Sequence, residues 1–260
     1  MNWCAGFLCV GGLAMSAAQA GTVVHMSQRD LPQGKAHPSS VIYAQNGQFR
    51  MDTLNDAGHV TDRVLVRDGN IWQVDMAKRT FYKFDKAALS GQHEQMQARM
   101  QAMLQSMPPE RRAEMQQRMN AMVQKRHTSA FTVTDTGRTD HAGSWSCEVW
   151  QLLRNGKVVS ESCIAARGSI AGGDELVDAI HKASAVATDV LSSLPEARTA
   201  AQHFALYGKI DGFPVRTREL AGGQAESEDL VTSIERHALP AGEFAIPKGF
   251  TQTTMGGYDD

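Results

Sequence analysis

Thioether side chains gather in one stretch of this sequence. Steps of three and four residues place side chains on one face of a helix, so the stretch predicts two short helices that each present a methionine face. Thioethers are unbranched and polarisable; they form deformable apolar surfaces and also bind soft metal ions such as Cu(I). Seven of the 13 methionines form this candidate site: Met96, Met100, Met103, Met107, Met115, Met119 and Met122.

Three interpretations of the methionine face are open. It fills the seam between two helices or packs on a sheet, it forms an adaptable surface for an apolar ligand, or it holds a soft metal ion. We take the apolar ligand surface as the leading hypothesis. In the metal alternative, the ligands to Cu(I) would be Met96, Met100, Met119, Met122, His93 and His127.

No sequence motif for catalysis accompanies the methionines. His93-Glu94 does not begin a His-Glu-x-x-His zinc motif, and Gly168-Ser169 has the wrong spacing for a nucleophile elbow. A phosphate-binding loop is also absent from the sequence. We therefore expect a protein that is not an enzyme and has no cofactor.

The charge balance argues against nucleic acid as a partner. The chain has 26 lysines and arginines and 28 acidic residues, and no basic run is longer than two residues. Binding to phosphates needs a concentrated basic surface. After the first 20 residues, no apolar run approaches the length of a membrane span.

Residues 1–20 have the pattern of a secretory signal peptide. The run from Trp3 to Met15 is apolar or small, and Ala18-Gln19-Ala20 fits the small-x-small rule for cleavage after Ala20. We expect an exported, periplasmic protein. Cleavage would leave Cys147 and Cys163 as the two remaining cysteines, and an even pair in an oxidising compartment predicts a disulfide.

The two cysteines lie on a predicted β-hairpin. Strand-like runs at 145–153 and 157–165 flank Arg154-Asn155-Gly156. A three-residue loop would place Leu153 opposite Lys157 and Cys147 directly opposite Cys163. The alternative is two free buried thiols.

An antiparallel meander is predicted between residues 22 and 85. Asn46-Gly47 and Asp68-Gly69 are hairpin signals between runs of β-branched and aromatic residues. One face is apolar, and we expect solvent to cover the other face, which carries Arg50, Asp52, Arg63 and Arg67.

The rest of the chain alternates between helix and strand patterns. A helical hairpin is predicted at about 86–126, broken at Pro108-Pro109, and a third helix at about 174–194. Further extended segments are predicted at 213–220, 230–238 and 244–251, with Glu226, Glu228 and Asp229 in a solvated turn. We expect a single domain at 21–252 and a loose tail at 253–260. The class is α+β, with helices against one face of a curved antiparallel sheet.

Several local motifs together resemble a known family. They are the signal peptide, the Asn-Gly and Asp-Gly meander, Met-Pro-Pro-Glu-Arg-Arg at 107–112, the cysteine hairpin, Gly-Phe-Pro-Val at 212–215 and Ile-Pro-Lys-Gly-Phe at 246–250. The combination looks like an exported bacterial family of unknown function that is itself similar to the LolA and LolB lipoprotein carriers. The resemblance implies an open half-barrel, with the Met-rich helical hairpin and the third helix on its concave face. Our leading hypothesis is that this concave face binds a hydrophobic ligand, lipid or lipoprotein moiety, which displaces a helix on binding.

Overall fold

A computed structural model describes residues 20–84, 86–127, 131–192, 201, 204–205, 207–240 and 242–254. At residues 88, 92 and 120–127, which lie in helices, only the backbone is described. The predicted signal peptide at 1–19 lies outside these ranges.

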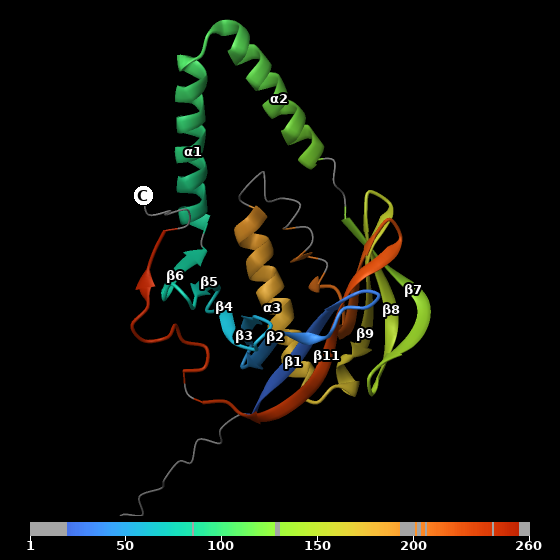
Figure 1. Cartoon of the computed structure of the whole chain (residues 1–260). Coiled ribbons are helices and arrows are strands. Elements are labelled where there is room, and N and C mark those ends of the chain that lie inside the picture. The colour runs from blue at the N-terminus through green and yellow to red at the C-terminus, as the bar shows by residue number, and fades with distance from the viewer. Residues whose placement is uncertain are drawn as a thin grey trace, which may run out of the picture.

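Over the described residues, the fold is a curved, unclosed sheet of 12 strands with three α-helices, which confirms the predicted α+β class (Figure 1). The order across the sheet is β12-β6-β5-β4-β3-β2-β1-β11-β10-β9-β8-β7. All neighbours pair antiparallel except β12, which runs parallel to β6. The strands are β1 (Ala20–Asp30), β2 (His37–Gln45), β3 (Gln48–Leu54), β4 (Val60–Arg67), β5 (Asn70–Asp75), β6 (Thr80–Phe84), β7 (Phe131–Ala142), β8 (Trp145–Arg154), β9 (Lys157–Ala166), β10 (Gly212–Ala221), β11 (Gln224–Ala238) and β12 (Thr251–Gln252).

The predicted meander is present, and its turns follow from backbone geometry. Asn46 and Gly47 have φ values of 55° and 70°, and Asp68 and Gly69 have values of 50° and 70°. Two successive residues with positive φ form the turn that matches the twist of a two-residue hairpin. Asn-Gly and Asp-Gly thus set the register of β2 with β3 and of β4 with β5.

Helix α3 (Gly173–Ser192) lies in the hollow of the sheet, close to the predicted range of 174–194 (Figure 1). Its buried Leu176 and Ala179 belong to the same core cluster as Val24 and Ile42 of β1 and β2. Glu175 in the first turn accepts a hydrogen bond from the backbone N–H of Asn46, with 2.6 Å between N and Oε1. The start of α3 is therefore fixed to the β2–β3 hairpin.

The other face of the meander is also covered, which corrects the expectation of a solvated face. Arg50 and Asp52 are 6% and 1% exposed, and the residues after β11 cross over them. The Arg50 Nη1 donates to the backbone oxygen of Glu243 at 3.1 Å and also binds its carboxylate. Phe244 is buried in the same segment. Charge pairing lets this arginine and aspartate be buried together.

Two more predicted details are wrong. The segment at 244–251 is not a strand: its residues form turns and irregular backbone until Thr251. Glu228 is not in a solvated turn, because β11 begins at Gln224 and the Glu228 side chain is 3% exposed, bound to Arg29 and Arg218. The predicted tail begins with an ordered residue, since the Thr253 N–H donates to the oxygen of Phe81 at 2.8 Å; residues 255–260 lie outside the described ranges.

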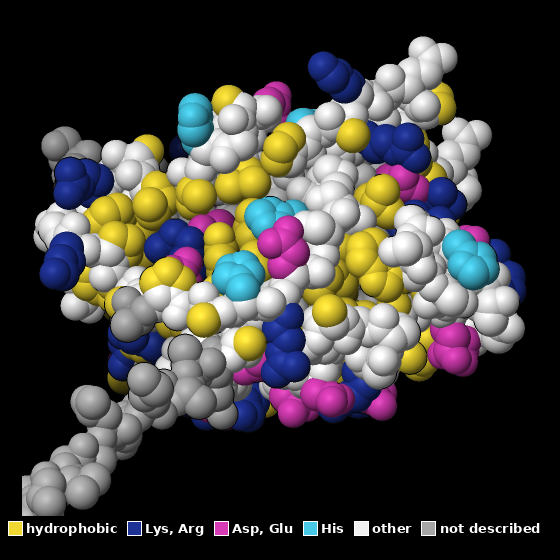
Figure 2. Space-filling model, turned by 90° about the horizontal axis from the view of Figure 1, so that it is seen from below, with side chains coloured by type: hydrophobic (Ala, Val, Ile, Leu, Met, Phe, Trp, Pro, Cys, Tyr) yellow, Lys and Arg dark blue, Asp and Glu magenta, His cyan; other side chains and the backbone are white. Residues whose placement is uncertain are grey.

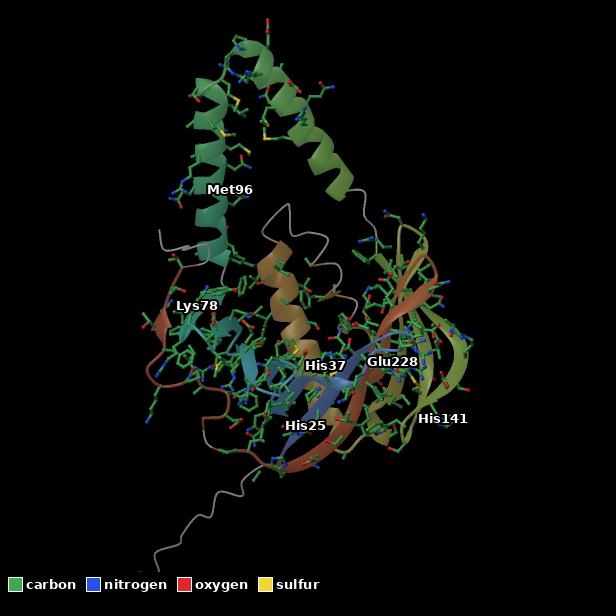
Figure 3. The ribbon with its side chains drawn as sticks, in the orientation of Figure 1. His25, His37, Lys78, Met96, His141 and Glu228 are labelled. Carbon is green, nitrogen blue, oxygen red and sulfur yellow. A yellow bond between two sulfur atoms is a disulfide. The ribbon has the colours of Figure 1, made fainter. Side chains whose placement is uncertain are left out.

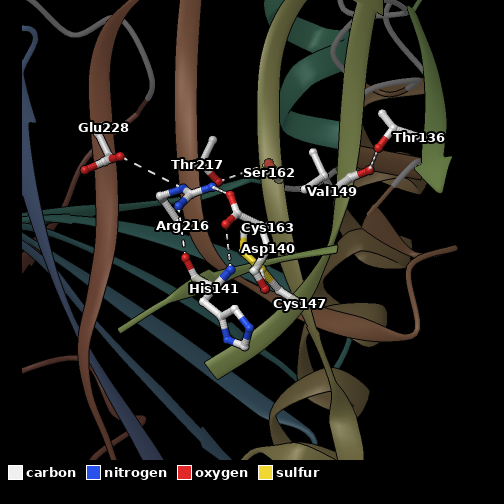
Figure 4. The surroundings of a disulfide bond; sticks show 10 residues. All are labelled: Thr136, Asp140, His141, Cys147, Val149, Ser162, Cys163, Arg216, Thr217 and Glu228. Atoms are coloured by element: carbon white, nitrogen blue, oxygen red, sulfur yellow. Dashed lines mark hydrogen bonds and ion pairs between the residues drawn. A yellow bond between two sulfur atoms is a disulfide. The ribbon is translucent and has the colours of Figure 1, made fainter. Parts of the chain in front are cut away.

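A disulfide joins Cys147 of β8 to Cys163 of β9, as predicted (Figure 4). The predicted register is wrong. Asn155 and Gly156 form a two-residue turn, and a bulge at Leu152 and Leu153 shifts the pairing, so that Val149 lies opposite Cys163. The bridge therefore runs diagonally between the strands, with 5.3 Å between its Cα atoms.

Candidate apolar ligand site

The methionine stretch forms a helical hairpin that connects strands near the two opposite edges of the sheet. Helix α1 (Lys86–Ser106) follows β6, next to one sheet edge, and α2 (Pro109–His127) leads to β7, the strand at the other edge. Figure 1 shows the two helices diverging from their turn as a V that extends away from the sheet. The proline pair ends α1 where the sequence predicts it.

Arg112 closes the turn between the helices. Its Nε donates to the oxygen of Leu104 at 2.9 Å, and its Nη2 donates to the oxygens of Gln105 and Met107 at 3.2 and 3.0 Å. These oxygens belong to the last turn of α1 and the junction after it, where carbonyls lack partners inside the helix. One arginine thereby donates hydrogen bonds to the free carbonyl groups at the end of α1 and fixes this end to the start of α2.

The methionines are only partly packed against other groups. Met96 and Met103 are 57% and 45% exposed, and the side chains of Met100, Met107, Met115 and Met119 are half-buried. Sulfur atoms lie on the inner side of the V (Figure 3). The side chain of Met122 lies outside the described residues. A helix seam therefore does not account for Met96 and Met103.

The base of α1 packs on the last turns of α3. Leu89 is buried and forms a small apolar cluster with Val190, flanked by Phe84 and Val186. Lys86 adds an ion pair with Asp189. The hairpin is thus held near its base while its tip extends away.

A small pocket opens at the same end of the sheet. It has a volume of about 30 Å³, and its lining includes Val133, Trp150, Leu152, Tyr207 and Ile210. Val133 is two residues after the start of β7, the strand that α2 leads into, so the pocket lies at the hairpin end. Sequence motifs do not reveal this pocket, because its lining comes from three strands and the segment after α3.

Two residues that follow α3, Tyr207 and Ile210, form one wall of the pocket. His181 on α3 makes a hydrogen bond through Nε2 to the oxygen of Ile210 at 2.9 Å, which fixes Ile210 against the helix. Phe204 and Tyr207 are 40% and 37% exposed. Burial and the nearby carboxylate of Glu219 raise the pKa of Tyr207, so its hydroxyl is protonated at neutral pH.

The opposite end of the molecule is different in character. Figure 2 shows charged and histidine side chains interrupting the apolar area there. Large exposed apolar side chains of the described chain lie instead on α1 and on the 204–210 segment. The hairpin end is therefore the better candidate for apolar binding.

The alternative metal ligands are only partly described. His93 on α1 has its Nε2 3.1 Å from Nε2 of Gln97, one turn along the helix. The side chains of Met122 and His127 lie outside the described part of α2. No group of three His, Cys, Asp or Glu side chains suited to a metal ion occurs in the described part of the chain. Likewise, no described helix has both the length and the apolar character of a membrane span.

Comparisons with known proteins give no family. No protein-family model matches the chain, and no curated protein matches it. A solved structure, an uncharacterized conserved protein from Thermus thermophilus, is similar at a TM-score of 0.44 and 10% sequence identity over 91% of each chain.

Proposed function

We propose that this chain is an exported, non-enzymatic binding protein that holds an apolar ligand, a lipid or the acyl part of a lipoprotein, between the methionine hairpin and the hollow of the sheet. One observation carries the proposal. Four large apolar side chains, Met96, Met103, Phe204 and Tyr207, are exposed on elements at the same end of the molecule. A contiguous exposed apolar surface is typical of a binding site, and a ligand held between the two elements would cover these four side chains together.

Methionine suits this role because its side chain adapts to ligands of different shape. An unbranched thioether has three rotatable bonds and fills irregular gaps. The hairpin contacts the body of the protein at the base of α1, through Leu89 and Lys86. Ligand would displace the hairpin about this base and cover the exposed methionines.

Export is supported by two independent features. Residues 1–20 have the signal-peptide pattern, and Cys147 and Cys163 form a disulfide, a bond that persists in oxidising compartments. The periplasm, where a lipid or lipoprotein must cross water between membranes, is the compartment that fits both.

A pair of methionine variants tests the function. Met100, Met103, Met115 and Met119 are replaced together by Gln in one variant and by Leu in the other. Binding of the dye N-phenyl-1-naphthylamine is measured by fluorescence, with Met76→Gln as the control outside the hairpin. We expect the Gln variant to lose binding at least tenfold, because polar amides replace the apolar face, while the Leu variant keeps it.

The same variants separate the copper alternative. Leucine keeps the apolar surface but has no sulfur ligand. A Cu(I) protein would therefore bind copper more weakly in both variants, which lack the alternative ligands Met100 and Met119. Unchanged dye binding in the Gln variant, with the circular dichroism of the sheet intact, would contradict the proposed role. Cu(I) that the wild type binds and the Leu variant binds more weakly would favour the metal site instead.

A further inference from the structure

Two thioethers of the methionine hairpin are open to solvent. Met96 and Met103 of α1 are 57% and 45% exposed. They lie seven residues apart, which places both on one face of the helix. Met96 lies on the part of α1 that projects beyond the sheet (Figure 3). A small dissolved oxidant such as hydrogen peroxide therefore reaches these side chains without any opening of the fold.

The methionines of the sheet are less accessible than these two. Met26 and Met51 pack against the main core cluster, and Met76, after β5, is half-buried. The remaining described methionine side chains of the hairpin are half-buried as well. Because exposure decides which sulfur atoms an oxidant reaches, Met96 and Met103 should react first among the described methionines.

No free thiol in the described part of the chain competes for the oxidant. Thiolates are the usual first targets of peroxide, but Cys147 and Cys163 are already joined in a disulfide. Both cysteines are also buried, at 5% and 1% exposure. The exposed thioethers are therefore the groups on which peroxide would act.

Peroxide converts a thioether to a sulfoxide in a step that needs no other reactant. A lone pair of the methionine sulfur attacks one oxygen of hydrogen peroxide, so that an S–O bond forms while the O–O bond breaks. The departing hydroxide takes the proton from the transferred oxygen and leaves as water. Sulfur loses two electrons and peroxide gains them. The product is a polar side chain in place of an apolar one.

We propose that Met96 and Met103 are a modification site for peroxides, and that their conversion to sulfoxides releases the ligand of the hairpin. This inference rests on the proposed function, because the same two side chains would cover the ligand. It adds regulation to that function: the chain binds its apolar ligand in the reduced form and loses it under oxidising stress. Methionine sulfoxide reductases return the thioether, so the switch is reversible.

The fold of the hairpin does not depend on these two sulfur atoms. The base of α1 is held by buried Leu89, and the turn is held by Arg112, whose Nε donates to the oxygen of Leu104. Oxidation should therefore change the polarity of the exposed face while the helices remain, so a loss of binding is separable from unfolding.

Limited oxidation of the purified full chain tests the site. The protein is treated with hydrogen peroxide until sulfoxide first appears, and its peptides are mapped by mass spectrometry. We expect sulfoxide at Met96 and Met103 before Met26 or Met76. Affinity for N-phenyl-1-naphthylamine should fall about tenfold, because the ligand no longer covers an apolar side chain at these positions. Circular dichroism should stay unchanged.

A pair of variants assigns the effect to these side chains. Met96 and Met103 are replaced together by Leu, and Met76→Leu is the matched control outside the hairpin. Each variant is compared with its own untreated sample, so its starting affinity does not enter the result. The same dose of peroxide should weaken dye binding in Met76→Leu as in the wild type and should have little effect in the double variant.

Repair of the wild type gives a second measurement that needs no variant. Methionine sulfoxide reductases for both sulfoxide epimers are added to the oxidised protein, with untreated protein as the control. Dye binding should return as the sulfoxides at Met96 and Met103 disappear. Binding that stays lost after their repair would contradict the switch.

The outcomes distinguish the switch from the function. Sulfoxide at Met96 and Met103 with unchanged dye binding would overturn the switch and leave the proposed function intact. An equal loss of binding in the double variant, or earlier oxidation of Met26 or Met76, would also overturn it. If the untreated wild type does not bind the dye, both proposals fail.

Discussion

Lys86 and Asp189 form an ion pair that joins the first turn of α1 to the last turns of α3, with 2.5 Å between Nζ and Oδ1. Both side chains are more than half exposed, at 51% and 66%. An exposed pair contributes about 0–1 kcal/mol. The buried contact of Leu89 with Val190 beside it must therefore provide most of the stabilisation where the base of the methionine hairpin joins α3.

Replacing Leu89 by Ala should loosen the hairpin. Loss of a buried leucine costs about 2–5 kcal/mol, and this small cluster at the base of α1 should lie near the lower end of that range. Hydrogen exchange of the α1 and α2 amides should become faster while the amides of the sheet stay protected. Lys86→Ala is the control and should change exchange much less; an equal effect of the two variants would contradict the apolar hinge.

The meander and the helix breaks could be predicted because local residues determine them. Asn46-Gly47 fixes a turn through positive φ, and Pro108-Pro109 ends a helix whatever surrounds it. The cysteine pair was also predictable, but not its register, because nothing local in the sequence marks the bulge at Leu152 and Leu153.

Features made by distant segments could not be predicted in this way. Arg50 and Asp52 alternate with apolar residues as a solvated strand face would, yet the segment containing Glu243, 193 residues after Arg50, covers them. The pocket is similar, because Tyr207 meets Trp150 through the folding of the segment after α3 onto β8 and β9. Charge and hydropathy patterns report which residues share a face, but not what covers it.

The buried charge cluster under the C-terminal segment should be important for stability. Asp52 accepts hydrogen bonds from Arg50 Nε at 2.9 Å and from Arg63 Nε and Nη2 at 2.7 and 3.0 Å. Replacing Asp52 by Asn removes the carboxylate that Arg50 and Arg63 share and leaves Arg50 paired with Glu243 alone. Breaking a buried ion pair costs about 3–5 kcal/mol. Urea unfolding should show this loss, whereas Asp56→Asn, on a 92% exposed side chain, should be nearly neutral; a neutral Asp52→Asn would contradict this account.

The same carboxylate predicts a dependence of stability on pH. Burial would raise the pKa of Asp52, but hydrogen bonds and charges from Arg50 and Arg63 outweigh burial and lower it. A lowered pKa in the folded state gives stability that is present above the unfolded pKa of about 3.9 and is lost as the pH falls through the folded value. Urea midpoints should therefore drop more steeply below about pH 4 in the wild type than in Asp52→Asn. If the urea midpoints of the two proteins fall in parallel with pH, Asp52 does not contribute to the pH dependence of stability.

The position of Gly21 predicts the order of export and folding. Ala20 and Gly21 pair with Ala238 and His237 of β11, and a side chain at Gly21 would come within 2.6 Å of Leu239. We proposed that the chain is exported and cut after Ala20. A protease needs this bond in an extended, unpaired segment, so such a cut must precede folding of β1. Signal peptidase should cut the urea-unfolded full chain and leave the folded one intact; equal rates would contradict this order.

Native mass spectrometry of the protein isolated from its own host tests the central claim most directly. Binding of an acyl ligand at the hairpin predicts an added mass of lipid size on the native protein, and its absence when Met100, Met103, Met115 and Met119 are all replaced by Gln. A bare native mass, or an added mass equal to copper, would contradict the proposed carrier.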